Sequence, residues 1–186
     1  MFEGPPVCKV LFCYSVHQEL FSHLQCEIPN LSFHEGLPDQ EEIEGLSSHS
    51  LIILDDLMDQ VVQSRTMQHL FTQYCHHKGL SVMYFSQNLF QQGRFSRTIS
   101  LNSQVIVLMK NLRSVGQITH LARQLYPHNK GMLEEIYQDC MKTPYGYLVI
   151  DLSPGGADEY RLRSKIFPGE HPTVYIPKQE WEVFIQ

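Results

Sequence analysis

Short apolar runs alternate with longer amphipathic stretches along the chain. Short, mainly apolar runs predict strands at residues 7–14, 51–54, 80–85, 105–109 and 147–152. Apolar residues that recur with a period near 3.6 predict helices at residues 18–24, 59–78, 115–126 and 129–141. Strands that alternate with helices predict an α/β fold built on a mostly parallel sheet.

Shorter segments complete this outline. They predict a second strand at 31–35, a turn of helix at 39–44 and a polar loop at 91–102. Ser153-Pro154-Gly155-Gly156 is expected to turn the chain into an antiparallel strand pair near 160–166 and 174–176, at the C-terminal edge of the sheet. Since 186 residues is the size of one domain, we expect a single domain over residues 1–186.

The charge is distributed unevenly along the chain. The net charge is −6, yet residues 60–133 contain no acid and eight bases, and acids outnumber bases on both sides of this segment. Clustered positive charge is typical of surfaces that bind the phosphates of nucleotides or nucleic acids. Alternatively, these bases solvate helix faces and pair with the acidic flanks. The eight are Arg65, Lys78, Arg94, Arg97, Lys110, Arg113, Arg123 and Lys130.

Other features predict the compartment. The five cysteines are scattered and form no C-x-x-C pair, which favours a reducing environment over a secreted disulfide framework. No apolar stretch approaches the roughly 20 residues that a membrane-spanning helix requires, and the first residues do not resemble a signal peptide. We therefore expect a soluble protein without membrane contact, inside a cell or a virion.

Two carboxylates follow one of the predicted buried strands. Asp55 and Asp56 come directly after the apolar run 51–54. At the carboxyl end of a parallel strand, Asp55 would hold Mg²⁺ through water and Asp56 would polarise the water that attacks a nucleotide phosphate. The same pair would also serve to cap the following helix, whose N-terminus attracts negative charge.

Polar residues after the next strand extend this pattern. Ser86-Gln87-Asn88 follow the run 80–85, and an amide there would contact both the γ-phosphate and the attacking water, which makes Gln87 a candidate sensor. The alternative is an amide that hydrogen-bonds loop backbone. Arg94 and Arg97 in the following loop are candidates to stabilise a transition state across a subunit boundary, or are ordinary surface residues.

Several ordered motifs resemble one family of motor proteins. They are Leu51-Ile-Ile-Leu-Asp-Asp-Leu57, His76-His77-x-Gly-Leu-Ser-Val82, Phe85-Ser-Gln-Asn-Leu-Phe90, Arg97-Thr-Ile-Ser-Leu-Asn102, His120-Leu-Ala-Arg-Gln-Leu-Tyr-Pro127, Tyr145-Gly-Tyr-Leu-Val-Ile-Asp151 and Arg161-Leu-Arg-x-x-Ile-Phe167. With these, the chain after about residue 7 resembles the FtsK/HerA-type genome-packaging ATPases of Maverick/Polinton elements and large DNA viruses, relatives of the poxvirus packaging ATPase.

The resemblance implies a fold, an activity and partners. It implies a RecA-like P-loop NTPase core with helices on both faces of the sheet, and a ring of five or six identical subunits that uses ATP and Mg²⁺ to pump double-stranded DNA into a capsid. Asp55 and Asp56 would be the Walker B pair. Gln87 and Asn88 would form the sensor motif, and Arg94, Arg97 or Arg113 the arginine finger.

One part of the family's pattern does not occur. No lysine of the chain follows a glycine, so the Walker A motif G-x-x-x-x-G-K-[ST] is absent, and with it the P-loop strand and helix expected before Pro5-Pro6. Three interpretations follow. The chain is the C-terminal major part of a packaging ATPase, incompetent for catalysis alone. Otherwise it is a non-catalytic interaction or DNA-binding protein, or an unrelated α/β domain whose Asp55 and Asp56 serve another metal-dependent phosphate chemistry.

Overall fold

A computed structural model describes residues 6–111 and 115–176. The chain divides into two compact units, Met1–Asn102 and Ser103–Gln186, and each is described by itself below. Arg113, one of the arginine-finger candidates, lies outside the described residues. The single domain expected over 1–186 stays a prediction.

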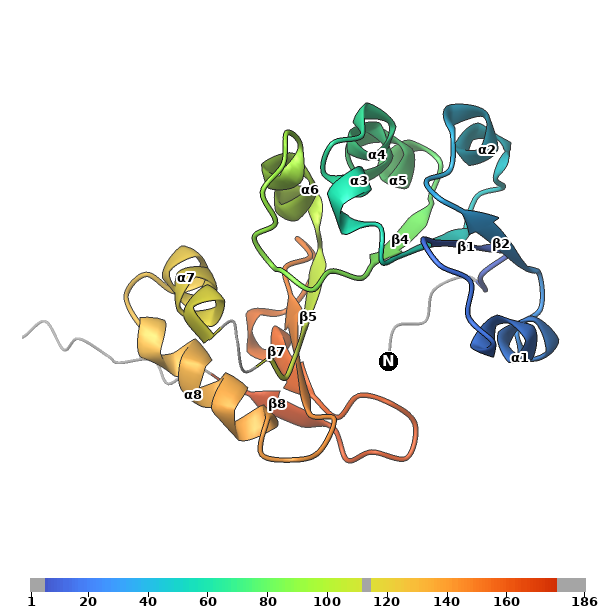
Figure 1. Ribbon diagram of the computed structural model, residues 1–186. Coiled ribbons are helices and arrows are strands. Elements are labelled where there is room, and N and C mark those ends of the chain that lie inside the picture. Colours follow the sequence, from blue (N-terminus) through green and yellow to red (C-terminus); the bar gives the residue numbers. More distant parts are fainter. Residues whose placement is uncertain (1–5, 112–114, 177–186) are drawn as a thin grey trace, which may run out of the picture. The chain divides into compact units, whose positions relative to one another are not determined.

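The first unit is built on a parallel sheet (Figure 1). Each strand lies within a segment predicted to form one, except that β3 extends one residue further, and all three pairings are parallel. The spatial order is β2-β1-β3-β4. The strands are β1 (Val10–Tyr14), β2 (Leu31–Glu35), β3 (Leu51–Asp55) and β4 (Ser81–Tyr84).

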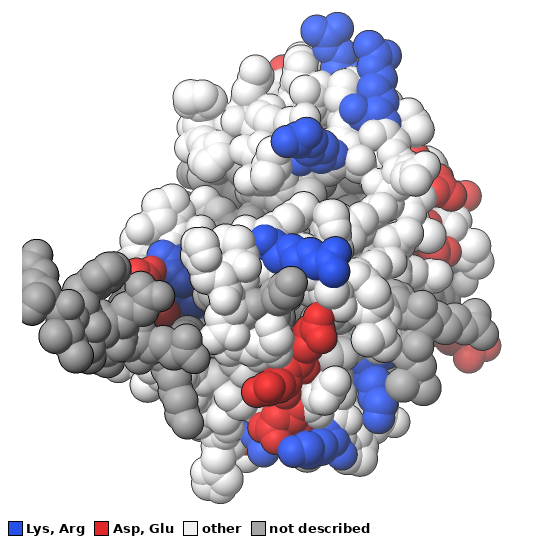
Figure 2. All heavy atoms as spheres, turned by 90° about the vertical axis from the view of Figure 1, so that its left-hand side faces the viewer, with Lys and Arg blue, Asp and Glu red and all other residues white. Residues whose placement is uncertain are grey.

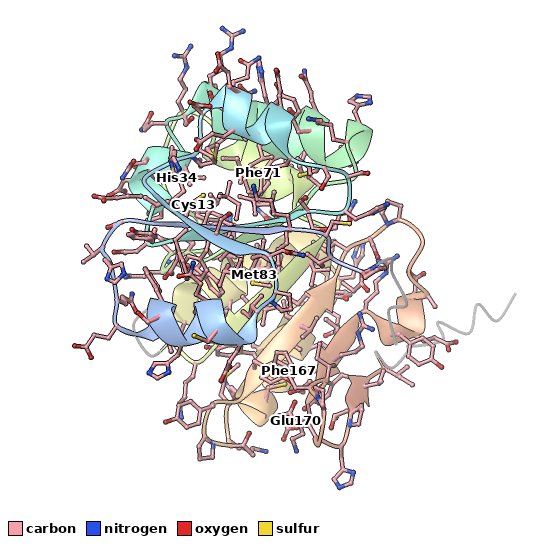
Figure 3. All side chains as sticks on the ribbon, turned by 90° about the vertical axis from the view of Figure 1, so that its right-hand side faces the viewer. Cys13, His34, Phe71, Met83, Phe167 and Glu170 are labelled. Carbon is pink, nitrogen blue, oxygen red and sulfur yellow. The ribbon has the colours of Figure 1, made fainter. Side chains whose placement is uncertain are left out.

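Helices cover both faces of this sheet, as predicted. On one face, Cys13, Ile52 and Leu54 pack against apolar residues of the helices that follow β2 and β3. On the other face α1 (Leu20–Glu27) places Phe21 against rings of β1 and β2, stacked on Phe33 with a centroid distance of 4.7 Å. Figure 3 shows Cys13 on the first face, and Met83 of β4 on the second.

α2 (Gln40–Gly45) begins at a capping box, which explains why this acidic segment is helical. The Asp39 carboxylate accepts a hydrogen bond from the Glu42 N–H at 2.8 Å, and the Glu42 carboxylate accepts one from the Asp39 N–H at 2.9 Å. Two N–H groups that lack helical partners are thereby satisfied. Ile43 then packs into the core, where it is fully buried.

The single helix predicted at 59–78 is wrong. The structure has a short α3 (Met58–Val61) and, after a break, α4 (Arg65–His69), which continues through a π-helical turn η1 (Leu70–Tyr74) into α5 (Cys75–His77). The break occurs because Ser64 adopts an extended backbone and its hydroxyl accepts a hydrogen bond from the Met67 N–H, so that a new helix starts there.

The polar loop predicted at 91–102 is partly wrong. Its second half forms α6 (Ser96–Asn102), in which Ile99 is buried against the core of the first unit. A single buried apolar side chain in seven residues leaves almost no periodic signal in the sequence, so the helix was missed. The helix depends on tertiary packing rather than on pattern.

The second unit is built on an antiparallel sheet, which corrects the prediction of one mostly parallel sheet. Residues 105–109 and 147–152 were expected to join the mostly parallel sheet. Instead they pair antiparallel with each other, and the order β5-β6-β7-β8 is antiparallel throughout. The predicted antiparallel C-terminal pair is confirmed. The strands are β5 (Val105–Met109), β6 (Tyr147–Asp151), β7 (Leu162–Ser164) and β8 (Thr173–Tyr175).

Two consecutive helices between β5 and β6 account for this difference. One helix after a strand returns the chain to the strand's starting end, which gives a parallel pair. Here α7 (Val115–Leu125) and α8 (Lys130–Cys140) pack together, so the chain traverses the sheet twice before β6 and re-enters from the end where β5 stops (Figure 1). The helices cover one face, and the Tyr137 hydroxyl donates to the Met109 carbonyl at 3.1 Å.

The expectations about the cysteines and about membrane-spanning helices can be compared with the described residues. All five cysteines are free thiols, and burial raises the pKa of Cys13 to about 12 and that of Cys75 to about 11. A raised pKa keeps both thiols protonated at neutral pH, and the thiolate is the reactive form. Within the described residues, no helix is both long and apolar enough to cross a membrane.

Candidate functional site

The carboxyl edge of the parallel sheet gathers most of the residues predicted to carry chemistry. β3 and β4 are hydrogen-bonded neighbours, and their last registered pair is Leu54 with Tyr84. Asp55 and Asp56 therefore leave β3 at the edge where Ser86, Gln87 and Asn88 leave β4. In open parallel sheets this edge is where ligands bind.

The turn after β3 holds the two carboxylates in different settings. Asp55 is half-buried at the end of the strand, and Asp56 is exposed with a left-handed backbone, φ 55°. Aspartate is among the few residues that tolerate this conformation, which costs of order 1 kcal/mol or more and clusters at functional sites. This turn takes the chain directly from β3 to the buried Leu57 and leaves Asp56 exposed at the carboxyl edge of the sheet.

The environment of Asp55 opposes its ionisation. Burial raises the pKa of Asp55 above its ordinary value of 3.8, and the negative charge of Asp56 adds to this rise. A hydrogen bond from the Asp56 backbone N–H acts in the opposite direction. Two neighbouring carboxylates that repel each other constitute a site whose charge a divalent cation would relieve.

Ser15 belongs to the same edge, although the sequence did not point to it. Tyr14 of β1 is in register with Asp55, so Ser15 stands beside Asp56, and its hydroxyl donates to the Asp56 carboxylate at 3.4 Å. A serine after an apolar strand is a common turn residue. It becomes a candidate only when the sheet order puts β1 next to β3.

The loop after β4 is held by its own side chains. The Asn88 side-chain oxygen accepts a hydrogen bond from the Phe90 N–H at 3.1 Å. The Ser86 hydroxyl donates to the Asn88 carbonyl at 2.7 Å and accepts from the Asn88 N–H at 3.3 Å. The structural role considered for Gln87, an amide that fixes loop backbone, is thus performed by its neighbour Asn88.

Gln87 occupies a different position in this loop. Its side chain is exposed, and no hydrogen bond of it to another described residue is recorded. Its amide is therefore available to a ligand at the sheet edge, whereas the Asn88 oxygen is already used within the loop. Of the two predicted sensor residues, Gln87 is the one whose geometry suits the role.

The loop continues onto α3 and is fastened there. The Gln91 amide donates to the Asp59 carboxylate at 2.6 Å, and the Phe95 N–H donates to the Val62 carbonyl at 2.9 Å. Gly93 lies so close to Val62 that a Cβ built on it would be 2.3 Å from a Val62 methyl carbon. The helix that follows the two carboxylates and the loop that carries Gln87 are thereby a single packed assembly.

The two described arginine candidates lie beyond this loop. Both are exposed, Arg94 over the ring of Phe95 at 5.1 Å and Arg97 in the first turn of α6. No interaction of either with Asp55 or Asp56 is recorded among the described residues. The structure therefore brings together the carboxylates and the Gln87 loop, and leaves the arginines on the outer surface.

The sheet edge offers a metal ion two carboxylates and not a full set of protein ligands. Among residues 6–111 and 115–176 no group of three or more His, Cys, Asp or Glu side chains is arranged to hold a metal ion. A Mg²⁺ ion commonly binds to one or two carboxylates and keeps several waters and substrate phosphates as its other ligands. Asp55 and Asp56 fit that kind of ligation.

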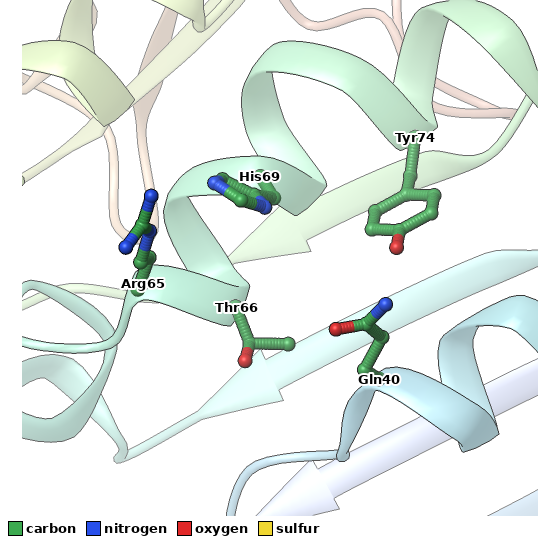
Figure 4. Close-up of a pocket in the computed structure, with 5 residues that line it drawn as sticks. All are labelled: Gln40, Arg65, Thr66, His69 and Tyr74. Atoms are coloured by element: carbon green, nitrogen blue, oxygen red, sulfur yellow. The ribbon is translucent and has the colours of Figure 1, made fainter.

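A separate small pocket of about 210 Å³ lies on the helical side of the first unit (Figure 4). Its lining includes Gln40, Tyr74 and Arg65, one of the eight bases considered for phosphates, but none of the predicted catalytic or metal-binding residues. The Gln40 amide and the Tyr74 hydroxyl both donate to the Glu44 carboxylate at 2.8 Å. Two of its polar groups are thus already bonded to Glu44, outside the lining, and the pocket has no carboxylate in its lining, which makes it a weaker candidate for a metal-dependent site than the sheet edge.

On the face drawn in Figure 2, Lys and Arg side chains lie among uncharged residues. Lys110 is also engaged locally, since its ammonium group donates to the Met141 carbonyl at 3.3 Å. The charge of Lys110 therefore serves the fold of its own unit.

Comparison with known proteins gives no relative from which a role for these residues could be transferred. No protein-family profile, curated protein or solved structure matches the chain.

Proposed function

We propose that this chain supplies the metal-binding and water-activating side of an ATP-hydrolysis site in a motor that packages double-stranded DNA. In this proposal Asp55 holds Mg²⁺ through water, Asp56 orients the attacking water, and Gln87 senses the γ-phosphate. The observation that carries the proposal is the adjacency of β3 and β4, which sets two carboxylates and an available amide at the carboxyl edge of a parallel sheet.

The electrostatics of the turn support the same assignment. Burial and the neighbouring charge raise the pKa of Asp55, and Asp56 keeps a left-handed backbone that stability alone does not favour. Groups held against their own preference are typical of functional sites, where a ligand relieves the strain. Helix capping explains the pair less well, because the N-cap of α3 is Leu57 and no side-chain hydrogen bond caps this helix.

The partners follow from the family resemblance. We propose a homo-oligomeric ring, a hexamer or pentamer, that contacts double-stranded DNA and capsid proteins. Arg94 and Arg97 are exposed, as a residue that acts on the site of a neighbouring subunit must be. Arg113 keeps this role as a proposal from the motif alone.

A second function is favoured by one specific observation. No G-x-x-x-x-G-K-[ST] sequence occurs among the 186 residues, and its N–H groups and lysine are the usual cradle of the β- and γ-phosphates. A chain without this cradle serves as a non-catalytic ring subunit that binds partner subunits or DNA. The two functions share the ring and the DNA and differ in nucleotide turnover.

Nucleotide binding and hydrolysis by the purified chain separate the two. Mg²⁺-dependent ATP hydrolysis that Asp56→Asn abolishes, and whose dependence on Mg²⁺ Asp55→Asn weakens, would refute the second function. Failure to bind ATP even at millimolar concentration would refute any hydrolytic role for this chain. If the first function holds, turnover should rise when a polypeptide that carries a G-x-x-x-x-G-K-[ST] segment of this family is added, and DNA binding with no turnover under that condition would support the second function.

A matched control variant tests whether loss of one negative charge is enough to reduce turnover. Glu27→Gln removes one exposed acid at the C-terminus of α1. Since α1 leads from the carboxyl end of β1 to the amino end of β2, this residue belongs to the opposite edge of the sheet. Turnover that falls equally in the control would show that net charge, and not the carboxylate edge, governs the activity.

A further inference from the structure

One wall of the small pocket in the first unit consists of hydrogen-bond donors. Arg65, Thr66 and His69 line this wall from α4, and their side chains make no hydrogen bond or ion pair within the part of the chain that the structure describes. Arg65 and His69 are four residues apart, so their side chains lie one turn apart on the same face of the helix (Figure 4). α4 therefore presents two nitrogen donors to one pocket.

The chemistry of this wall favours an anion. The Arg65 guanidinium group carries a permanent positive charge, donates from several N–H groups and accepts no hydrogen bond. The His69 ring donates from at least one nitrogen, and Thr66 adds a hydroxyl. No carboxylate lines the pocket, so no residue of the lining neutralises Arg65.

The opposite wall, from α2 and η1, contributes an acceptor. The Gln40 amide nitrogen donates to the Glu44 carboxylate at 2.8 Å, which fixes the orientation of the amide. Its oxygen is thereby turned toward Thr66, as Figure 4 shows. The Tyr74 hydroxyl donates to the same carboxylate. The pocket thus offers donors on α4 and an amide oxygen on α2.

Glu44 brings a negative charge close to the pocket, and other groups compensate it. The hydrogen bonds from Gln40 and Tyr74, with a smaller effect of the Lys78 charge, lower the pKa of Glu44. The Lys78 ammonium group also donates to the Glu44 carbonyl. The charge of Glu44 is therefore compensated by groups other than Arg65, which stays available to a ligand.

The size of the pocket and its acceptor identify the anion. A volume of about 210 Å³ is below the roughly 300–1,000 Å³ of pockets that enclose larger organic ligands, so a whole nucleotide does not fit. A tetrahedral oxyanion is small enough and offers separate oxygens to Arg65 and His69. Hydrogen phosphate also carries a hydroxyl that can donate to the Gln40 oxygen, whereas sulfate has no proton at neutral pH.

We propose that this pocket binds inorganic phosphate. Arg65 and His69 donate to oxygens of the ion, and the Gln40 amide oxygen accepts the proton of its hydroxyl. The bound ion connects α4 to α2. All the residues involved belong to the first unit, and the site requires neither a metal nor nucleotide hydrolysis, so it holds for either proposed function.

Isothermal titration calorimetry of the full chain with inorganic phosphate tests the site. The titration is made without Mg²⁺ and at constant ionic strength. Under this condition Asp55 and Asp56 only repel an anion, so the result reports on the pocket and is separate from the test of hydrolysis. One phosphate per chain should bind, and sulfate should bind about tenfold more weakly, because it leaves the Gln40 oxygen without a donor.

Arg65→Gln should weaken phosphate binding by about tenfold or more, since it removes charge-assisted hydrogen bonds. Arg123→Gln is the matched control, because it removes one exposed arginine from α7 of the second unit, and it should leave binding unchanged. Gln40→Ala should abolish the preference for phosphate over sulfate. His69→Ala should also weaken binding, and it decides the matter if the circular dichroism spectrum shows that Arg65→Gln does not fold.

Three results would overturn the proposal. The first is an unmodified chain that shows no saturable binding of phosphate. The second is an equal loss in Arg65→Gln and Arg123→Gln, because net charge and not the pocket would then hold the ion. The third is sulfate binding as tight as phosphate binding, because the Gln40 oxygen would then have no part in recognition.

Discussion

Replacing Gly93 by alanine tests whether the loop that carries Gln87 is fastened to α3 as the structure indicates. A Cβ at this position would lie 2.3 Å from the Val62 Cγ2, 2.6 Å from its Cβ and 3.1 Å from its carbonyl oxygen. Gly93 is not among the glycines with a left-handed backbone, so the substitution strains no dihedral angle. Its whole effect comes from the contact with Val62.

The expected loss of stability follows from the fact that Val62 cannot move away from an added methyl group. Val62 is 3% exposed, and its carbonyl accepts the Phe95 N–H at 2.9 Å, so neither the side chain nor the backbone is free to move away. Forcing extra volume into a packed site of this kind costs about 1–3 kcal/mol. With a denaturant dependence of about 1–3 kcal/mol per molar urea, the unfolding midpoint should fall by roughly 1 M.

Urea unfolding followed by circular dichroism measures this change. Gly116→Ala is the matched control, because a Cβ there meets no atom within 4 Å, and it should leave stability unchanged or raise it by up to about 1 kcal/mol. The midpoint of the Gly93→Ala variant should lie clearly below both. A Gly93→Ala protein as stable as the unmodified chain would refute the packing of loop against helix.

A double mutant identifies the contact responsible. Val62→Ala removes the closest atom but leaves the Cβ at 2.6 Å, so the relief should be partial. The loss in the double mutant should be smaller than the sum of the two single losses by at least about 0.5 kcal/mol. Simple additivity would mean that Gly93→Ala acts elsewhere.

The remaining predictions concern other parts of the chain. In the folded chain the pKa of Asp55 lies above its ordinary value of 3.8, so the free energy of unfolding is highest below pH 3.8 and falls as the pH rises through the folded-state pKa. Asp55→Asn should therefore be more stable than the unmodified chain near neutral pH. This difference should vanish when unfolding is measured in acid. Gly146→Ala should destabilise the second unit by about 1–3 kcal/mol in thermal melts, since its Cβ would lie 2.0 Å from the Cys140 carbonyl oxygen, whereas Gly155→Ala, with open space, should not. Asp39→Ala should cost about 0.5–2 kcal/mol in urea unfolding, because it removes the N-cap of α2.

The elements with a strong local signal could be predicted from the sequence. Each strand predicted from an apolar run is present, and α7 and α8 lie within two residues of the segments with helical periodicity. The break at Ser64 and the helix α6 were missed. A side-chain cap interrupts the first in mid-pattern, and only packing of Ile99 against the core specifies the second.

In the candidate site, too, some features follow from local sequence and others only from tertiary structure. The sequence determined that carboxylates follow one buried strand and a polar triplet follows another, because strand ends are fixed by local composition. Which strands are neighbours depends on pairings between residues far apart in the chain, and this decided that Ser15 joins Asp56 and that the arginines lie apart.

The separation into two sheets also lay beyond the sequence pattern. An apolar run such as Val105–Met109 forms equally well in a parallel or an antiparallel sheet, so the run alone determined a strand and not its direction. The direction was decided by tertiary structure, because two packed helices return the chain to the opposite end of the sheet from one. The sequence determined where this chain forms strands and where its carboxylates lie, and only the tertiary structure decided which of them meet.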